Sequence, residues 1–333
     1  MAEMTLHQDG FHPVNLFESA KAAAVAIILA GCFSVSVAAQ QPGQKTFSSA
    51  ERGSDALVAA TQSNDEKAML DILGRNGKQV VSSGDDADDA ESRANFVRRY
   101  QEMHRLVKEP DGTTVLYIGA HNWPYPIPLI DKGHAWYFDT EAGKREILYR
   151  RIGRNEISAI RVCQELVASE KEYSAQHKEY ARNIFSDHGQ DGLYWKAENG
   201  EPQSPIGPLV ALAVPKGFAQ SRDSGSTPYR GYYFHILTGE KKNGGHAKSY
   251  LADGKMTEGF AFVAYPAEYR SSGVMTFIVN EDGTVYEKDL GPKTESIGKA
   301  MKEYDATAGW QKSEGQEQET AAEQTPQGNQ TPQ

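Results

Sequence analysis

Histidine is the residue type best suited to acid–base catalysis and metal binding at neutral pH, and the chain holds nine histidines. None of them shows the His-x-x-x-His spacing of a zinc helix, with or without an adjoining glutamate. His121 and His134 flank one expected hairpin, where they can approach each other and Asp139. This group lacks the spacing of a metal motif, so we expect no metal site and no cofactor.

The acidic and nucleophilic residues also lack a catalytic pattern. Aspartates at 85, 86, 88 and 89 form the densest acidic cluster, but the central glycine and closing glutamate of a calcium loop are missing, and such acids are typical of a helix N-terminus. No Gly-x-Ser-x-Gly turn and no glycine-rich phosphate loop occurs. We therefore predict no catalytic residue. The alternative is an envelope hydrolase with dispersed active-site residues, for which the suspects are His121, His134, Asp85 and Glu170.

Aromatic residues in loop-like segments are the better candidates for a binding site. Trp123 and Tyr125 lie among prolines, and Tyr194 and Trp195 follow a glycine. Exposed aromatic side chains on loops suit the recognition of a protein or a glycan. The alternative is that these four side chains close the ends of a sheet or fill a contact between domains.

The N-terminal segment predicts export from the cell. Residues 1–39 resemble a secretory signal peptide, with Lys21 before an apolar run and small residues at its end. Two processing routes remain open: lipidation at Cys32 within Leu-Ala-Gly-Cys, or cleavage before Gln40; an uncleaved anchor is a third alternative. We therefore expect a periplasmic protein, attached to a membrane only through this segment or a lipid.

Charge and cysteine content exclude several classes of protein. The net charge is −10, from 35 basic and 45 acidic residues, and nucleic-acid-binding proteins carry basic surfaces instead. The two cysteines are too few for a disulfide framework or a cysteine-based zinc site. Of these, Cys163 falls on an apolar helical stripe and is expected to be buried. We expect an envelope protein or a glycan as partner, and no nucleic acid.

Hydrophobic periodicity predicts an α+β fold with two domains. After a linker at 40–46, the first domain (47–152) is expected to place helices on a small antiparallel sheet. Its helices are predicted at 48–61 and 64–73, with Asn64 as N-cap, and, after a loop at 82–86, in a longer helix to about residue 107. Its strands are predicted at 113–120, 125–130 and 134–139.

The second domain (153–310) is expected to pack one long helix on an antiparallel sheet. The helix is predicted from Asn155 to about Tyr180, separated by Gly153 from the helix before it. Strands are predicted at 231–238, 259–265, 274–279 and 284–290, the last two joined by Asn-Glu-Asp-Gly, and a final helix at 294–304. Residues 311–333 are rich in glutamine, glutamate, threonine and proline, so a disordered tail is expected.

Several segments carry a resemblance in their order along the chain: Ser83-Gly84-Asp85, Asn122 to Leu129, Trp136 to Thr140 with Gly143, Arg151 to Glu156, Asp191 to Trp195, Tyr229 to Phe234, and Gly273 to Asn280 with Lys288 to Gly291. Together they resemble the uncharacterised bacterial family catalogued as domain of unknown function 2950, over about residues 47–310. That resemblance implies an exported context and supplies no reaction.

The C-terminal part also looks like the globular domain of type IV pilins and pseudopilins. The order of one helix, a variable loop and an antiparallel sheet from Asn155 to Leu290 carries this likeness. A pilin begins with an apolar helical spine, whereas the residues just before Asn155 include Arg150, Arg151 and Arg154. Unpaired charges are too costly to bury in a fibre core, so the likeness implies a fold without pilin-type filament assembly.

Together these features predict an exported cell-envelope protein of unknown activity that acts as a binding or structural module. An envelope hydrolase is one alternative, and an accessory factor of a pilus or secretion system is another. Candidate binding residues are Trp123, Tyr125, Tyr194 and Trp195.

Overall fold

The computed structural model describes residues 40–82, 86–186, 190–195, 204–206, 228–241 and 247–313, with the backbone alone at 86–88. The expected signal peptide with Cys32, the segment from Ser83 to Asp85, and the tail after 313 lie outside these residues. No helix in the described ranges is both long and apolar enough to cross a membrane. Two lobes are distinguished below: an N-terminal lobe of residues 40–138 and a C-terminal lobe of residues 159–313, with helix α5 contributing to both.

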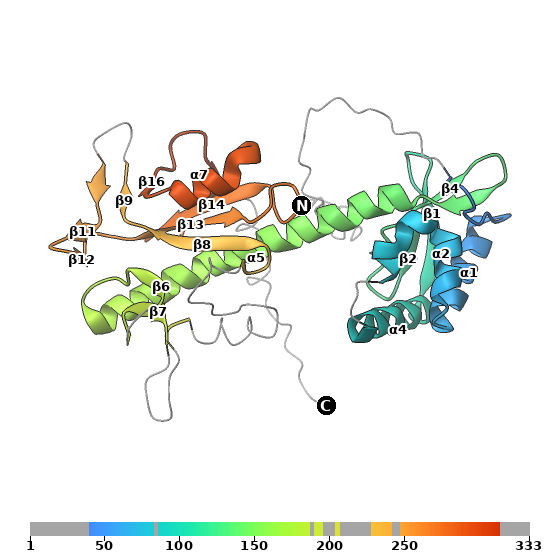
Figure 1. Cartoon of the computed structure of the whole chain (residues 1–333), viewed down its shortest axis with the longest axis horizontal. Helices are drawn as coiled ribbons and strands as arrows, with labels where there is room; N and C mark the ends of the chain where they lie inside the picture. Colours follow the sequence, from blue (N-terminus) through green and yellow to red (C-terminus); the bar gives the residue numbers. More distant parts are fainter. Residues whose placement is uncertain are drawn as a thin grey trace, which may run out of the picture. The chain divides into compact units, whose positions relative to one another are not determined.

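The N-terminal lobe packs helices against an antiparallel sheet of order β1-β2-β4-β5, with β3 paired to β2 (Figure 1). Leu57, Leu73 and Leu129 are buried where α1 and α2 meet the sheet. Its elements are α1 (Ala50–Gln62), α2 (Glu66–Leu73), the 3₁₀ turn η1 (Arg75–Gly77), α3 (Lys78–Val81), α4 (Asp86–Glu102), β1 (His104–Lys108), β2 (Thr114–Ile118), β3 (Trp123–Pro124), β4 (Leu129–Asp131) and β5 (Trp136–Phe138).

The helix predicted to end at about residue 107 is α4, and it is shorter than predicted. It ends at Glu102 because the Gly119 N–H bonds the carbonyls of Arg99 and Met103 at the helix terminus. The chain then continues as β1, whose five residues pair with β2, so Val107 and His104 lie in a strand and the prediction of a helix to 107 is wrong. Pairing along five positions outweighed helical periodicity here.

Two smaller predictions in this lobe are also corrected. Asp65, not Asn64, caps α2 by accepting the Ala68 N–H, while Asn64 adopts a positive φ in the turn before it. The strand predicted at 125–130 is interrupted: β3 ends at Pro124 and β4 begins at Leu129. Prolines at 126 and 128 have no N–H to donate to a ladder, which explains the interruption.

Helix α5 (Thr140–His177) is one continuous helix, so the predicted break at Gly153 is wrong. Asp139 caps its start by accepting the Ala142 N–H, and Lys178 ends it in the left-handed conformation. Buried side chains near its start, such as Thr140, contact the N-terminal lobe, and those from Ala159 onward belong to the C-terminal core.

The C-terminal lobe is built on an antiparallel sheet of order β17-β15-β14-β13-β8. Helix α5 packs against β13, β14 and β15, and α7 packs against β13 from the other side (Figure 1). All six residues of β13 are buried because both of its faces are covered. The Asn280–Gly283 turn joins β14 to β15, as the sequence predicts.

The smaller elements of this lobe correct two further boundaries. The last helix ends at Ala300, and Tyr304 lies in a strand parallel to β9. Gln311 pairs with β15, so the sheet continues past residue 310. The elements are β6 (Asn183–Phe185), β7 (Gly192–Tyr194), β8 (Tyr232–Leu237), β9 (Gly239–Glu240), β10 (Lys248–Ser249), β11 (Leu251–Ala252), β12 (Lys255–Met256), β13 (Ala261–Pro266), β14 (Met275–Asn280), β15 (Val285–Asp289), η3 (Gly291–Lys293), α7 (Thr294–Ala300), β16 (Glu303–Tyr304) and β17 (Gln311–Lys312).

The architecture is therefore α+β, with a long helix followed by an antiparallel sheet. The helix-on-sheet arrangement of the C-terminal part agrees with the expected fold class.

Candidate functional site

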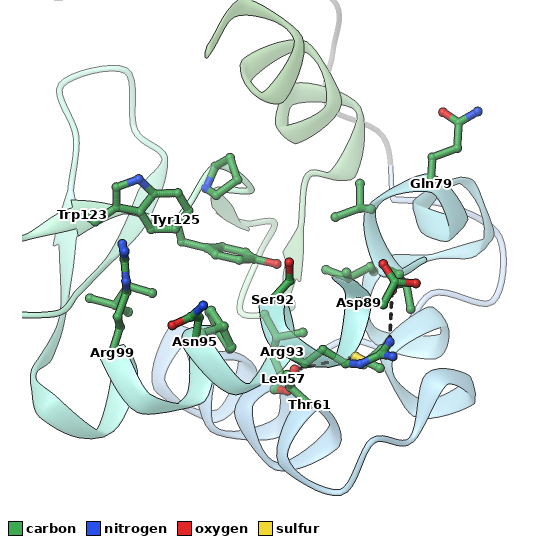
Figure 2. A pocket seen from close by; sticks show the side chains of 17 residues that line it. Leu57, Thr61, Gln79, Asp89, Ser92, Arg93, Asn95, Arg99, Trp123 and Tyr125 are labelled. Carbon is green, nitrogen blue, oxygen red and sulfur yellow. Dashed lines mark hydrogen bonds between the residues drawn. The ribbon is translucent and has the colours of Figure 1, made fainter. Parts of the chain in front are cut away.

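A cavity of about 450 Å³ lies in the N-terminal lobe between α4 and the chain segment from Trp123 to Pro126 (Figure 2). A cavity of this volume is within the range that holds a small organic ligand. It is lined by Leu57, Thr61, Met69, Leu73, Gln79, Val80, Val81, Asp89, Ser92, Arg93, Asn95, Phe96, Arg99, Ile118, Trp123, Tyr125 and Pro126.

Helix α4 supplies most of the polar wall. Asp89, Ser92, Phe96 and Arg99 follow one another at three or four residues, which places them on one face of the helix. A helix face that covers a core is normally apolar, yet this one has polar side chains at all but one of these positions. Of these polar residues Ser92 and Arg99 are exposed, so this face of the helix opens to solvent beside the cavity.

The opposite wall is apolar and rigid. Leu57, Leu73 and Ile118 are each no more than 2% exposed and belong to the packed core of the lobe. They come from α1, α2 and β2, so three elements fix the shape of this wall. The cavity thus combines an apolar wall with a polar helix face.

Trp123 is held at the edge of the cavity by two arginines. The guanidinium carbon of Arg150 lies 5.1 Å from the Trp123 ring centroid, and that of Arg99 lies 6.0 Å from it. Arg150 is itself fixed, because it donates to the Pro124 carbonyl and to Glu146, both at 2.7 Å. These contacts fix the position of the Trp123 ring. The side chain is 37% exposed, so it remains accessible.

Tyr125 extends from the neighbouring position into the cavity. Its ring packs against Phe96, with centroids 5.2 Å apart, and its hydroxyl points toward Ser92 (Figure 2). Burial raises the pKa of this phenol well above its ordinary value, so the hydroxyl stays neutral. Tyr125 therefore offers the cavity a hydrogen-bond donor on a rigid aromatic ring.

The charges of the cavity are divided between its two ends. At one end the side chains of Asp89 and Arg93 point toward each other (Figure 2), and Arg93 also donates to the Val81 carbonyl at 3.3 Å. At the other end stands Arg99, which forms no ion pair within the described residues. The positive charge of Arg99 is thus the uncompensated charge of this wall.

The two predicted aromatic pairs lie in different lobes. Trp123 and Tyr125 line the cavity. Tyr194 ends β7 in the C-terminal lobe, where it meets the Phe185 ring edge-on, and Trp195 is 7% exposed within the core of that lobe. The structure therefore brings the first pair together at a cavity and leaves the second pair among core side chains.

The residues considered for catalysis are also separated. His121 lies in the turn before β3 and His134 in the turn before β5, and neither lines the cavity. Glu170 is fully buried on α5, where one carboxylate oxygen accepts the Ala181 N–H at 2.9 Å. Asp85 lies outside the described residues, and within them no three metal-ligating side chains gather.

Sequence reasoning missed the part of the site on α4. Ser92, Asn95 and Arg99 are not among the predicted site residues, because the sequence of this segment is typical of an acidic helix N-terminus followed by a helix with apolar residues on one face. The available signal is the mixture of polar and apolar residues on the helix face that includes Phe96. Its meaning depends on which elements face it, and these are distant in sequence.

The segment from Arg151 to Glu156 has a structural role. The Glu156 carboxylate accepts the N–H groups of Val274 and Met275 at 2.9 and 3.1 Å, and Asn155 donates to the Ser272 carbonyl at 2.8 Å. These bonds fasten α5 to the turn that precedes β14. Burial raises the pKa of Glu156, although its two backbone bonds favour the charged form.

Comparison with known proteins gives a family and no closer relative. Searches of the curated proteins and of the solved structures found no match. A scan against protein families matched residues 44–313 to the family described as "Protein of unknown function (DUF2950)". This range includes the cavity, all of α5 and the C-terminal sheet, and the chain therefore belongs to the DUF2950 family.

Proposed function

We propose that the protein is an exported cell-envelope module that binds a small ligand in the cavity of its N-terminal lobe. The observation that carries this proposal is the 450 Å³ cavity, in which one apolar wall faces a polar helix beside a fixed tryptophan. A preformed, mostly apolar cavity with a few converging polar groups is the usual form of a ligand site.

A small ligand fits this geometry better than a glycan stacked on the tryptophan. Sugars bind to open aromatic faces, whereas the Trp123 ring is already approached by the guanidinium groups of Arg99 and Arg150. The apolar wall lies deeper, at Leu57 and Leu73. We therefore favour a ligand with an apolar body that enters the cavity over one that rests on its rim.

The test is a titration of the purified full chain with N-phenyl-1-naphthylamine, a neutral fluorescent amphiphile. Ser92→Trp places a bulky side chain in the cavity, and Ala94→Trp places the same side chain on an exposed position of the same helix. We expect saturable binding by the parent and Ala94→Trp, and at least a tenfold loss in Ser92→Trp. Equal binding by both variants, each shown to be folded by circular dichroism, would overturn the proposal.

Export is a separate part of the proposal and rests on the sequence of the first 39 residues. The apolar run after Lys21 supports a signal peptide, and Leu-Ala-Gly before Cys32 supports lipidation. Intact mass and membrane fractionation of the protein made in its native host test both. An acylated Cys32 in the membrane fraction means a tethered protein, a soluble chain that begins at Gln40 means a periplasmic one, and unprocessed cytosolic protein would contradict export.

The likeness to pilins remains part of this proposal at the level of fold. A helix packed along an antiparallel sheet supports it, and the charged residues on the first half of α5 argue against filament assembly. Arg150 illustrates the point, because it is engaged by Glu146 and the Pro124 carbonyl within the chain itself. We expect no filaments of the purified protein by electron microscopy.

A further inference from the structure

The polar groups beside Trp123 can all donate hydrogen bonds, and the two hydroxyl groups among them can also accept. Arg99 carries only donors, and no hydrogen bond to the Tyr125 hydroxyl is found in the described part of the chain. Ser92 supplies a hydroxyl toward which Tyr125 points (Figure 2). The oxygen of the Asn95 amide accepts Arg98 at 3.0 Å, which leaves its NH₂ group to donate.

A set of donors with one uncompensated positive charge is complementary to an acidic group. A carboxylate, sulfonate or phosphate offers acceptors alone, and charge-assisted bonds to it are stronger than bonds between neutral groups. At the other end of the cavity Asp89 and Arg93 point toward each other, so that end lacks the same preference. The apolar wall from Leu57 to Leu73 remains for the rest of the ligand.

We propose that the cavity binds a small anionic amphiphile, with its acidic group at Arg99, Tyr125, Ser92 and Asn95 and its apolar body against the wall formed by Leu57, Leu73 and Ile118. This inference rests on the proposed function and specifies the class of ligand. Arg99 is its central specificity residue, because its charge is the one that an acidic group would neutralise.

Two matched probes test the acidic group separately from the cavity. 1-Anilinonaphthalene-8-sulfonate carries the anilinonaphthalene body of N-phenyl-1-naphthylamine with one added sulfonate. We expect the full chain to bind the anionic probe about tenfold more tightly than the neutral one, the size expected from one charge-assisted contact. Both titrations are followed by probe fluorescence at constant salt.

The variants separate a specific contact from the general charge of the protein. Arg99→Gln is expected to weaken the anionic probe about tenfold and to leave the neutral probe unchanged. Arg52→Gln removes the same charge from an exposed position on α1 outside the cavity and is expected to change neither. Tyr125→Phe keeps the ring and removes its donor, so it is expected to weaken the anionic probe alone.

The outcomes distinguish the two proposals. If Ser92→Trp leaves the neutral probe bound as before, the cavity is not the site and the proposed function fails. A second outcome is that Ser92→Trp loses the neutral probe, while Arg99→Gln and Tyr125→Phe affect neither probe or affect both probes equally. In that case the cavity binds ligands but does not recognise an acidic group. That result would overturn this inference alone. Circular dichroism and thermal midpoints confirm that each variant is folded.

Discussion

At the residue scale, Glu170 is a carboxyl group removed from water. It is completely buried on α5, and its Oε1 atom has no hydrogen-bond partner among the described residues. Burial raises the pKa of this carboxyl to about 8, and the Ala181 N–H that it accepts offsets this only in part. Glu170 therefore keeps its proton in the folded protein at neutral pH.

This burial predicts a pH dependence of stability with a definite sign. The unfolded chain ionises Glu170 near its ordinary pKa of 4.5, while the folded chain holds the proton until about pH 8. Between these values the folded state binds the extra proton, so stability falls as pH rises, by at most about 1.4 kcal/mol per pH unit. Glu170→Gln removes this titration and leaves an amide oxygen for the Ala181 N–H.

Urea unfolding at pH 5 and pH 8 measures the effect. We expect the parent to lose more unfolding free energy between pH 5 and pH 8 than Glu170→Gln does. The variant therefore gains stability relative to the parent at pH 8. Glu172→Gln changes an exposed glutamate on the same helix and serves as the control. A parent and Glu170→Gln with parallel pH profiles would show that the carboxyl titrates normally.

Cys163 is a residue whose burial could be predicted from the sequence pattern. Its place on an apolar stripe predicted a buried side chain; the thiol is 0% exposed, and burial raises its pKa to about 12. Ala159, Leu166 and Tyr173 lie on the same apolar stripe and are also in the core. The unpaired carboxylate oxygen of Glu170 gave no such signal, because its partners depend on the chain after the helix.

At the element scale, the two glycines of α5 have different surroundings: Gly143 is tightly packed and Gly153 is open. A Cβ added at Gly143 would lie 2.4 Å from an Ile127 side-chain carbon, whereas nothing lies within 4 Å of one added at Gly153. Gly153→Ala is expected to stabilise the protein by about 0.5 to 1 kcal/mol, because alanine reduces the freedom of the unfolded chain. Gly143→Ala is expected to cost about 1 to 3 kcal/mol through overpacking.

Thermal and chemical unfolding of the two single variants test this pair. The two substitutions are chemically identical and lie on one helix, so each is the control for the other. Destabilisation by Gly153→Ala would mean that its surroundings are tighter than the structure shows. A neutral Gly143→Ala would mean that the segment around Ile127 yields easily.

The predicted elements succeeded where local pattern and tertiary pairing agreed. The Asn280–Gly283 hairpin combines a strong turn signal with two apolar strands, and its position was predicted correctly. Prediction failed where another element decided the result, as at β1, which pairs with β2 instead of extending α4. Gly153 suggested a break that α5 does not make, since one glycine is tolerated inside a helix whose two ends are packed.

At the scale of the whole molecule, the buried side chains fall into separate groups. The core of the C-terminal lobe begins at Ala159, and the two clusters of the N-terminal lobe end at Phe138 and Ile118. The cavity belongs entirely to the N-terminal group. Its walls come from positions between Leu57 and Pro126, so the surroundings of Trp123 and Tyr125 could not be predicted from the sequence next to them.

Separate cores predict separate responses to core substitutions. Phe138→Leu removes buried volume from the N-terminal lobe, and Phe262→Leu does so in the C-terminal lobe. In native-state hydrogen exchange, we expect each variant to lose amide protection in its own lobe by tenfold or more, with the other lobe within about twofold of the parent. Equal losses in both lobes would show that they unfold as one cooperative unit.

Helix α5 also limits where recombination could divide the gene of such a protein. Its first turns bury Thr140 and Gly143 in the N-terminal lobe, and its later turns supply Cys163 and Leu166 to the C-terminal core. A recombination point inside either of these two parts of the helix would leave one lobe without part of its core. Exchange of one lobe between genes would therefore have to divide the helix between Gly143 and Ala159, and the family match across 44–313 includes both lobes and this helix.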